Sequence, residues 1–181
     1  MILGLDISTS CTGWCILSED GSLVDIGSLK LKSALSPFQK ACEVESSFKH
    51  LQENFHINSV FIEQNLQAFR PGFSSAKTLI TLARFNGVVS YLAEQVFKCT
   101  PEYINVNVAR KSVGLKIIPK RSGGAPTKEQ VFKWTDQKID CDWPLKKMKS
   151  GPRKGQTVLD DSRFDMADAF VIATAGSKLN I

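Results

Sequence analysis

The sequence lacks the features of a membrane, zinc or disulfide-stabilised protein. It contains no apolar run of the roughly 18–20 residues that a membrane-spanning helix requires. Its five cysteines include no CxxC pair, and only His50 and His56 are available to complete a zinc site. No signal-peptide pattern begins the chain. We therefore expect one domain spanning residues 1–181, in a reducing compartment and cytoplasmic, with no membrane partner.

Acidic residues are absent from two segments that are rich in cations, 103–128 and 144–158. The whole chain carries a net charge of +5 and has a pI of about 9.0. Clustered cations suit a polyanion such as DNA, because each cation near a phosphate releases condensed counterions. A pair of solvated loops is the alternative interpretation. The cations that we expect to contact DNA are Arg110, Lys111, Lys116, Lys120, Arg121, Lys146, Lys147, Arg153 and Lys154.

The order of apolar patterns predicts an α/β fold. Strands are expected at 2–6, 13–18, 24–30, 59–64 and 103–108, and helices at 36–55, 75–97, from 127 and at 162–175, with a short helix that starts near Asn107. The turn sequence EDGS joins the second and third strands as a hairpin. Three strands followed by alternating strands and helices predict a mixed five-stranded sheet, antiparallel over its first three strands and flanked by helices.

Several local patterns give more detailed expectations. Ser36 is expected to cap the first helix, with Phe38 and Cys42 on its buried face. The pair Thr127 and Gln130 matches a capping box for a later helix. The segment 144–158 is expected to be a basic linker without strands.

Four carboxylates stand at positions that favour a shared site. Asp6 and Glu63 each end an apolar strand, so parallel pairing of those strands would place them side by side. Asp165 and Asp168 are three residues apart and share one helical face, which also carries Ala169 and is expected to pack on the sheet. Two acids on a packing face are hard to explain by solubility.

Carboxylates this close repel one another, and bound cations remove the conflict. A site of oxygen ligands without histidine or cysteine suits Mg²⁺ or Mn²⁺, and two such ions can assist phosphodiester hydrolysis. The acids next to basic segments therefore predict a metal-dependent nuclease. Each acid also has a structural alternative: Asp6 as a turn cap, Glu63 paired with Arg84, and Asp165 and Asp168 as helix-start acids.

Five segments in order resemble the RuvC-type Holliday junction resolvases of the RNase H-like superfamily, and the short chain resembles a phage or viral branch. The segments are ILGLDISTSCTGW, VFIEQ, LARFNGVV (where Gly87 would allow close packing), ARKSVGL with TKEQV, and DMADAFVIA. The resemblance implies an RNase H-like fold and a homodimeric endonuclease that cuts four-way DNA junctions by paired nicks. It implies two Mg²⁺ ions held by Asp6, Glu63, Asp165 and Asp168, with Lys128 next to the reacting phosphate.

Further expectations concern the DNA path and the dimer. Ser8, Ser10 and Thr12 follow Asp6 where a phosphate would approach, and the exposed face of helix 75–97 is expected to form the dimer interface. Where the family commonly places a stacking aromatic, this chain has Leu66, so the stacking role falls to Phe69 or Phe73, with Arg70 as a DNA contact.

Two other functions remain open at this point. An actin-like ATPase or sugar kinase also follows a strand-ending aspartate with a hydroxyl-rich turn, but it needs two domains and a glycine that is absent between Ile7 and Thr12. A non-catalytic DNA-binding scaffold is the other alternative. We interpret Asp160 and Asp161 as acids at a helix start. The alternative is that they are outer-shell groups of the metal site.

Overall fold

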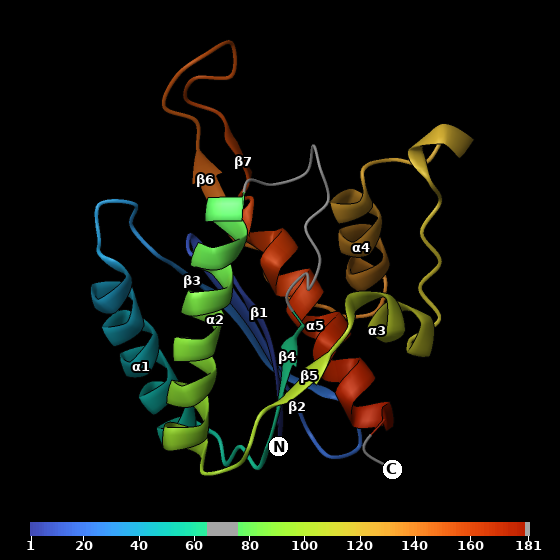
Figure 1. The fold of residues 1–181 in the computed structure, drawn as a ribbon. Helices are drawn as coiled ribbons and strands as arrows, with labels where there is room; N and C mark the ends of the chain where they lie inside the picture. Colours follow the sequence, from blue (N-terminus) through green and yellow to red (C-terminus); the bar gives the residue numbers. More distant parts are fainter. Residues whose placement is uncertain (65–75, 180–181) are drawn as a thin grey trace.

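A five-stranded sheet forms the centre of the fold (Figure 1). The computed structural model describes residues 1–64 and 76–179. The strand order is β3-β2-β1-β4-β5. The strands are β1 (Ile2–Ile7), β2 (Cys11–Leu17), β3 (Leu23–Lys30), β4 (Ser59–Glu63) and β5 (Glu102–Ile104).

The sheet is mixed, as the sequence predicted. β1 pairs with β2, and β2 with β3, in antiparallel fashion, whereas β1 pairs with β4 and β4 with β5 in parallel. The carboxyl ends of β1 and β4 therefore meet at one edge of the sheet. This edge carries the site described below.

Helices cover both faces of the sheet (Figure 1). On one face, α1 (Pro37–Asn54) and α2 (Ala76–Phe97) pack on the buried side chains Leu3, Leu5 and Ile7 of β1. The other face is covered by α5 (Ser162–Leu179), which packs on β1 and β2 and also contacts α3 (Val106–Ser112) and α4 (Thr127–Asp136). A short 3₁₀ helix, Lys120–Ser122, precedes α4. No helix of the described ranges has the length and apolar character to cross a membrane.

The first helix begins as predicted, but the prediction of its buried residues was partly wrong. The Ser36 side chain accepts a hydrogen bond from the Gln39 amide, and the Ser36 amide donates to the Gln39 side chain at 2.9 Å. Phe38 is 79% exposed and Cys42 is also exposed. The inward stripe is instead Ala41, Val44, Phe48 and Leu51, which follows the 3.6-residue period without Phe38 or Cys42.

The expected strand 103–108 is wrong in its second half. The strand ends at Ile104, and Asn105 caps α3 by accepting a hydrogen bond from the Asn107 amide at 3.0 Å. A polar side chain that caps a helix competes with strand pairing, which explains the early end of β5.

The expected capping box before α4 is also wrong. Pro126 occupies the N-cap position, and Thr127 makes no capping hydrogen bond. The Gln130 side chain instead donates to the carbonyl oxygens of Ile118 and Ala125, at 2.9 and 2.6 Å, and so holds the preceding loop against the helix.

The basic segment 144–158 forms a hairpin rather than a linker. β6 (Leu145–Lys147) and β7 (Thr157–Leu159) pair in antiparallel fashion. Figure 1 shows this hairpin projecting away from the sheet beyond the start of α5. β7 leads into α5, the helix that carries Asp165 and Asp168.

Candidate active site

Asp6 and Glu63 lie on neighbouring parallel strands. Leu5 is paired with Ile62, so the next residues along β1 and β4 are Asp6 and Glu63. Alternate side chains of a strand point to opposite faces, and Leu5 and Ile62 face α1 and α2. The two carboxylates therefore face the side of the sheet that α5 covers, as the strand pattern predicted.

Two glycines bring α5 close to this edge. Gly13 is the partner of Asp6 across β1 and β2, and a Cβ atom at Gly13 would overlap the backbone carbonyl of Asp165. A Cβ atom at Gly4 would likewise overlap the α5 backbone at Ala169. These close approaches place the first turn of α5 directly over the strand ends, and Asp165 next to Asp6.

Asp168 is held by a cation from α3. Its Oδ1 atom accepts a hydrogen bond from Nη2 of Arg110 at 3.4 Å, and the two side chains are 13% and 18% exposed. The Arg110 Nε atom is buried without a partner within the described residues. Arg110 therefore lines the carboxylate site, instead of standing free on the surface as a DNA contact.

Burial raises the pKa of every carboxyl in the group, and repulsion from other members adds to it at Asp6, Glu63 and Asp168. For Asp6, burial has the largest effect, followed by the charges of Glu63, Asp168 and Asp165. Burial and the Asp168 charge raise the pKa of Glu63 to about 7. Burial also raises the pKa of Asp165 and of Asp168, although Arg110 opposes it at Asp168. The four groups therefore act on one another electrostatically as one cluster.

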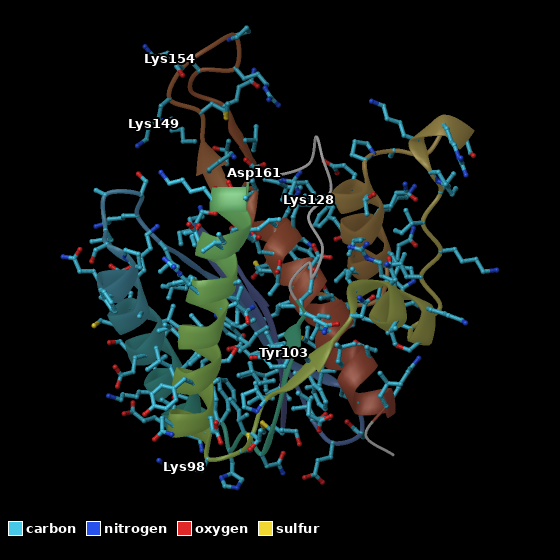
Figure 2. All side chains as sticks on the ribbon, in the orientation of Figure 1. Lys98, Tyr103, Lys128, Lys149, Lys154 and Asp161 are labelled. Atoms are coloured by element: carbon cyan, nitrogen blue, oxygen red, sulfur yellow. The ribbon has the colours of Figure 1, made fainter. Side chains whose placement is uncertain are left out.

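Lys128 is the cation that acts on the whole cluster. It lies in the first turn of α4, is exposed, and its positive charge lowers the pKa of all four carboxyls. Its Nζ atom is 6.0 Å from the centre of the Phe164 ring on α5. Lys128 thus lies close enough to act on all four carboxyls, at the same end of the molecule as Asp161 (Figure 2). Its place next to a reacting phosphate stays a prediction.

Cys11 joins the site without having been predicted. Burial and the neighbouring Asp165 carboxylate raise the pKa of its thiol to about 12, and the thiol is hydrogen-bonded to Asp165. It therefore stays protonated and donates to that carboxylate. The signal in the sequence is its place two residues before Gly13, on the strand that pairs with the Asp6 strand.

The donor set fits a hard divalent cation by its chemistry. Four crowded carboxylates whose pKa values are raised are the oxygen ligands that such an ion prefers and stabilises in the charged form. Among residues 1–64 and 76–179, however, no three acidic, histidine or cysteine side chains already form a metal-binding group. In the described residues the carboxylates are thus gathered at one edge but do not form a ready-made ligand set.

The turn after Asp6 is organised by Ser8. Its hydroxyl donates to the Cys11 carbonyl at 2.7 Å and accepts from the Cys11 amide at 3.0 Å. Ser10 is exposed beside it. Thr12 is only 1% exposed, and its hydroxyl has no partner in the described part of the chain. The Thr12 side chain is thus buried in this structure, and a phosphate contact of this turn, through a hydroxyl or an amide, stays a prediction.

The remaining predicted DNA contacts divide into three groups. Lys146 lies in an ion pair with Asp161. Phe69, Arg70 and Phe73 lie outside the described residues. The exposed cations are Lys111, Lys116, Lys120, Arg121, Lys147, Arg153 and Lys154.

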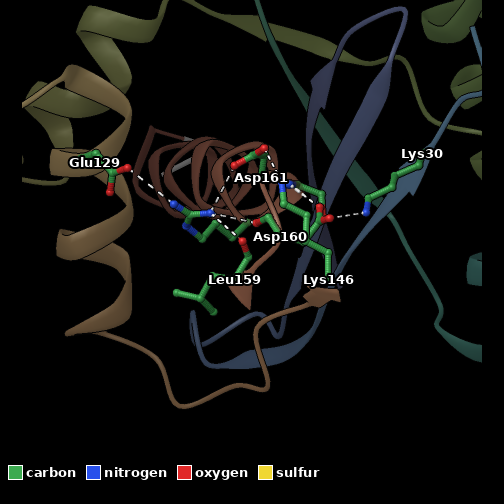
Figure 3. A network of polar contacts seen from close by, with 8 residues as sticks. Lys30, Glu129, Lys146, Leu159, Asp160 and Asp161 are labelled. Carbon is green, nitrogen blue, oxygen red and sulfur yellow. Dashed lines mark hydrogen bonds and ion pairs between the residues drawn. The ribbon is translucent and has the colours of Figure 1, made fainter. Parts of the chain in front are cut away.

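A polar network fixes the start of α5 (Figure 3). Asp160 accepts a hydrogen bond from the Ser162 amide at 2.9 Å and pairs with Lys30 of β3 at 2.7 Å. Burial raises the pKa of Asp160, but these contacts outweigh it and the pKa falls to about 2. Asp161 pairs with Lys146 and with Arg163. Both acids thus serve the helix start, in line with the first interpretation of the pair.

Comparison with known proteins identifies the family. The crossover junction endodeoxyribonuclease RuvC of Aliarcobacter butzleri is 32% identical over 133 residues, which cover 72% of this chain and 77% of the relative. The chain belongs to the RuvC family. RuvC of Sulfurovum sp. is 30% identical over 133 residues, covering 72% of this chain and 75% of the relative. No family model matches the sequence.

Solved structures of RuvC-type resolvases share the fold. Thermus thermophilus RuvC, in complex with a Holliday junction substrate, matches 99% of this chain and 93% of its own, with a TM-score of 0.63 and 12% identity. The yeast mitochondrial Holliday junction resolvase Ydc2 matches 98% of this chain and 77% of its own, with a TM-score of 0.56 and 16% identity. The predicted RuvC-type fold is therefore confirmed.

Gly87 departs from what the resemblance implied. A Cβ atom there would meet no atom of the described residues within 4 Å, so the glycine does not serve close packing among them. It lies on the exposed face of α2.

Proposed function

We propose that this protein is a metal-dependent endonuclease that resolves four-way DNA junctions by paired symmetric nicks. The observation that carries the proposal is the convergence of Asp6, Glu63, Asp165 and Asp168 at one sheet edge beside Lys128, in a chain of the RuvC family. The crossover junction endodeoxyribonuclease activity named for its relatives supports the substrate.

The four carboxylates are the proposed ligands of two Mg²⁺ ions, with Mn²⁺ as a substitute. Bound ions of this kind lower the pKa of a water and stabilise charge on the phosphate oxygens. Asp6 lies between Glu63 and Asp165 and is positioned to be shared by both ions. The charge of Arg110 opposes the rise in the pKa of Asp168 and so favours its ionised form.

Lys128 is the proposed stabiliser of negative charge that develops on the scissile phosphate. Its charge is exposed at the mouth of the site, and no acidic side chain in the described residues holds it in an ion pair. A preorganised cation near the reacting phosphate stabilises the transition state. The exposed cations Lys111, Lys116, Lys120 and Arg121 of the neighbouring loop and helix, together with Ser8 and Ser10, are proposed to hold the DNA backbone.

The decisive experiment compares Asp6→Asn with Glu53→Gln, an exposed acid on α1 that serves as control. Each protein is incubated with a labelled four-way junction, a duplex and a flap, with Mg²⁺, Mn²⁺ or a chelator. We expect symmetric junction nicks from the wild type and the control with metal, and none from Asp6→Asn, which still binds the junction. Unchanged cutting by Asp6→Asn would refute the catalytic role, and binding without cutting by the wild type would indicate a scaffold.

Resolution by paired nicks also requires two active sites, so we propose a homodimer formed through the outer face of α2. Ile80, Val88 and Tyr91 are 51%, 39% and 61% exposed on this helix, and Gly87 between them leaves open space. Tyr91→Lys is expected to convert the dimer to a monomer in light scattering, while Tyr103→Lys on β5, a residue that is 50% exposed, leaves the mass unchanged. A wild-type monomer at micromolar concentration would contradict the interface.

A further inference from the structure

The β6–β7 hairpin combines dense positive charge with an ordered backbone. Between Pro144 and Leu159 there is no acidic residue. Lys147, Lys149, Arg153 and Lys154 are exposed, and none has an ion-pair partner in the described ranges 1–64 and 76–179. Their charge is therefore available to a partner outside the chain.

The hairpin stays ordered beyond its short strands. The Met148 amide donates to the Gln156 carbonyl and the Gly155 amide to the Met148 carbonyl, both at 2.9 Å. At the tip, the Lys154 amide donates to the Gly151 carbonyl at 3.0 Å. Gly151 and Gly155 have φ angles of 77° and 87°, which side chains other than glycine rarely adopt. The turn chemistry thus builds a two-stranded ribbon with a cationic tip.

The base of the ribbon is anchored to the catalytic helix. The Asp160 amide donates to the Pro144 carbonyl at 2.7 Å, and Lys146 pairs with Asp161 across the base. Arg163 of α5 donates to the Leu159 carbonyl at 3.3 Å. Figure 3 shows the contacts of Lys146 and of the Leu159 carbonyl gathered around the first turn of α5. The ribbon therefore has a fixed direction relative to Asp165, two residues beyond Arg163.

The ribbon and the site lie at the same end of the molecule. Figure 2 shows Lys149 and Lys154 on the ribbon beyond Asp161 and Lys128, whereas Lys98 lies at the opposite end. At about 3.3 Å per residue, the seven residues from Leu145 to Gly151 reach roughly 20 Å from the base. A DNA strand bound at the carboxylates thus continues within reach of the ribbon.

We infer that the β6–β7 hairpin lies in the major groove of one duplex arm of the substrate, next to the branch point. The inference rests on the proposed function for its choice of branched DNA. The major groove, about 12 Å wide, admits a two-stranded ribbon whose strands are about 5 Å apart. The tip cations then contact phosphates on both sides of the groove. Because these contacts are to phosphates, they hold the arm without reading its sequence.

The test is the triple variant Lys149→Gln, Arg153→Gln, Lys154→Gln. The matched control removes the same charge from exposed lysines far from the site, as Lys49→Gln, Lys98→Gln, Lys178→Gln. Binding to a four-way junction is measured without divalent metal across a salt series. We expect the hairpin variant to bind about tenfold or more weakly at physiological salt. The slope of log K against log salt should fall by about 2–3, since each lost phosphate contact removes about 0.9.

The position of the hairpin on the DNA is tested by dimethyl sulfate protection, which shows whether guanine N7 in the major groove is covered. The wild type and the control are expected to protect guanines on one arm beside the branch point, and the hairpin variant to lose that protection. Equal weakening by the control triple would show a general charge effect and overturn the inference, as would N7 protection that the hairpin variant retains.

These measurements do not depend on cutting. If the wild type binds junctions and fails to nick them, the proposed nuclease function fails while the hairpin result stands. If Asp6→Asn abolishes nicking but the hairpin triple binds as the wild type does, only the hairpin inference fails.

Discussion

Gly13 lies directly beneath the backbone of Asp165, and this contact joins the sheet to α5. Across β1 and β2, Gly13 is also the partner of Asp6. One residue without a side chain therefore sets the separation between two carboxylates that are 159 positions apart in the sequence (165 − 6). Glycine is required here for space, because its φ angle is not among the positive ones.

Gly13→Ala is expected to destabilise the protein and impair the site together. The added Cβ would overlap the Asp165 carbonyl, which forces α5 away from the sheet. Overpacking of this kind costs about 2–3 kcal/mol, and we expect a lower melting temperature and a large loss of junction cutting. Thermal unfolding and a nicking assay measure the two effects.

The matched control is Gly87→Ala on the exposed face of α2, where a Cβ atom meets no atom of the described residues. Both alanines are compared in Tyr91→Lys protein, so that the proposed dimer contact does not enter the measurement. Alanine favours a helix over glycine by up to about 1 kcal/mol, so this variant should unfold at the same or a higher temperature. Equal destabilisation by both alanines would show that close packing at Gly13 is not the cause.

Glu63→Gln is expected to stabilise the metal-free protein at neutral pH. The pKa of Glu63 is about 7 in the folded chain, above the usual 4.5, so the folded state binds the proton more tightly than the unfolded state. Stability therefore falls as pH rises from about 5 to 7, and the glutamine variant loses part of this slope. We expect a gain of about 1–2 kcal/mol at pH 7.5, or roughly 2–8 °C.

This prediction is measured by melting temperature against pH in the presence of a chelator, with Glu53→Gln as the exposed control. Adding Mg²⁺ should stabilise the wild type more than Glu63→Gln, because the variant has lost a charged ligand. A wild-type melting temperature that rises between pH 5 and 7 would contradict the raised pKa of the cluster.

Asp160 affects the free energy of unfolding only at lower pH. Because its pKa is lowered to about 2 in the folded chain, the stabilisation from its ionised side chain is lost as pH falls from about 4 toward 2.

Lys128→Gln is expected to lower the nicking rate about 10–100-fold at saturating metal, with a smaller effect on junction affinity. The reason is the loss of the cation that we propose to lie next to the scissile phosphate, and whose charge lowers the pKa of the carboxyls. Lys133→Gln, an exposed residue on the same helix, is the control. Partial recovery by Lys128→Arg would support a role of the charge, whereas an unchanged single-turnover rate in Lys128→Gln would remove Lys128 from the catalytic group.

The carboxylate cluster was predictable because its signals are local. A strand that ends in an acid, and two acids three residues apart on a helix, can be recognised from periodicity alone. Parallel pairing of β1 and β4 then brings Asp6 and Glu63 together. The mixed sheet, antiparallel over its first three strands, followed from the same alternation of strands and helices, whereas the strand order was not predicted.

Contacts between distant segments were not predictable in this way. Arg110 meets Asp168 across 58 positions, and the contact depends on how α3 docks on α5. Cys11 hydrogen-bonds Asp165 because a glycine lets the helix approach. Gln130 matched the sequence pattern of a capping box, but its side chain donates hydrogen bonds to carbonyl groups of the preceding loop instead. In each case the packing of distant segments determines which partner the side chain contacts, and the sequence alone does not distinguish the possible partners.

Arg163→Lys is expected to destabilise the start of α5 although it keeps the charge. The Arg163 guanidinium lies 4.0 Å from the centre of the Phe164 ring, and 5.2 Å from that of Phe132 on α4. It also pairs with Glu129 of α4 and donates to the Leu159 carbonyl of the hairpin. A lysine offers neither the planar stacking surface nor several fixed donors, so we expect a loss of about 1–2 kcal/mol.

Arg153→Lys makes the matched control, because Arg153 is exposed at the hairpin tip and has no ion-pair partner in the described chain. It should change the free energy of unfolding by less than about 0.5 kcal/mol. Since Arg163 joins α4 to α5, its replacement should also displace Lys128 relative to the carboxylates and lower the nicking rate. Equal unfolding free energies for Arg163→Lys, Arg153→Lys and the wild type would show that the stacked guanidinium does not hold the two helices together.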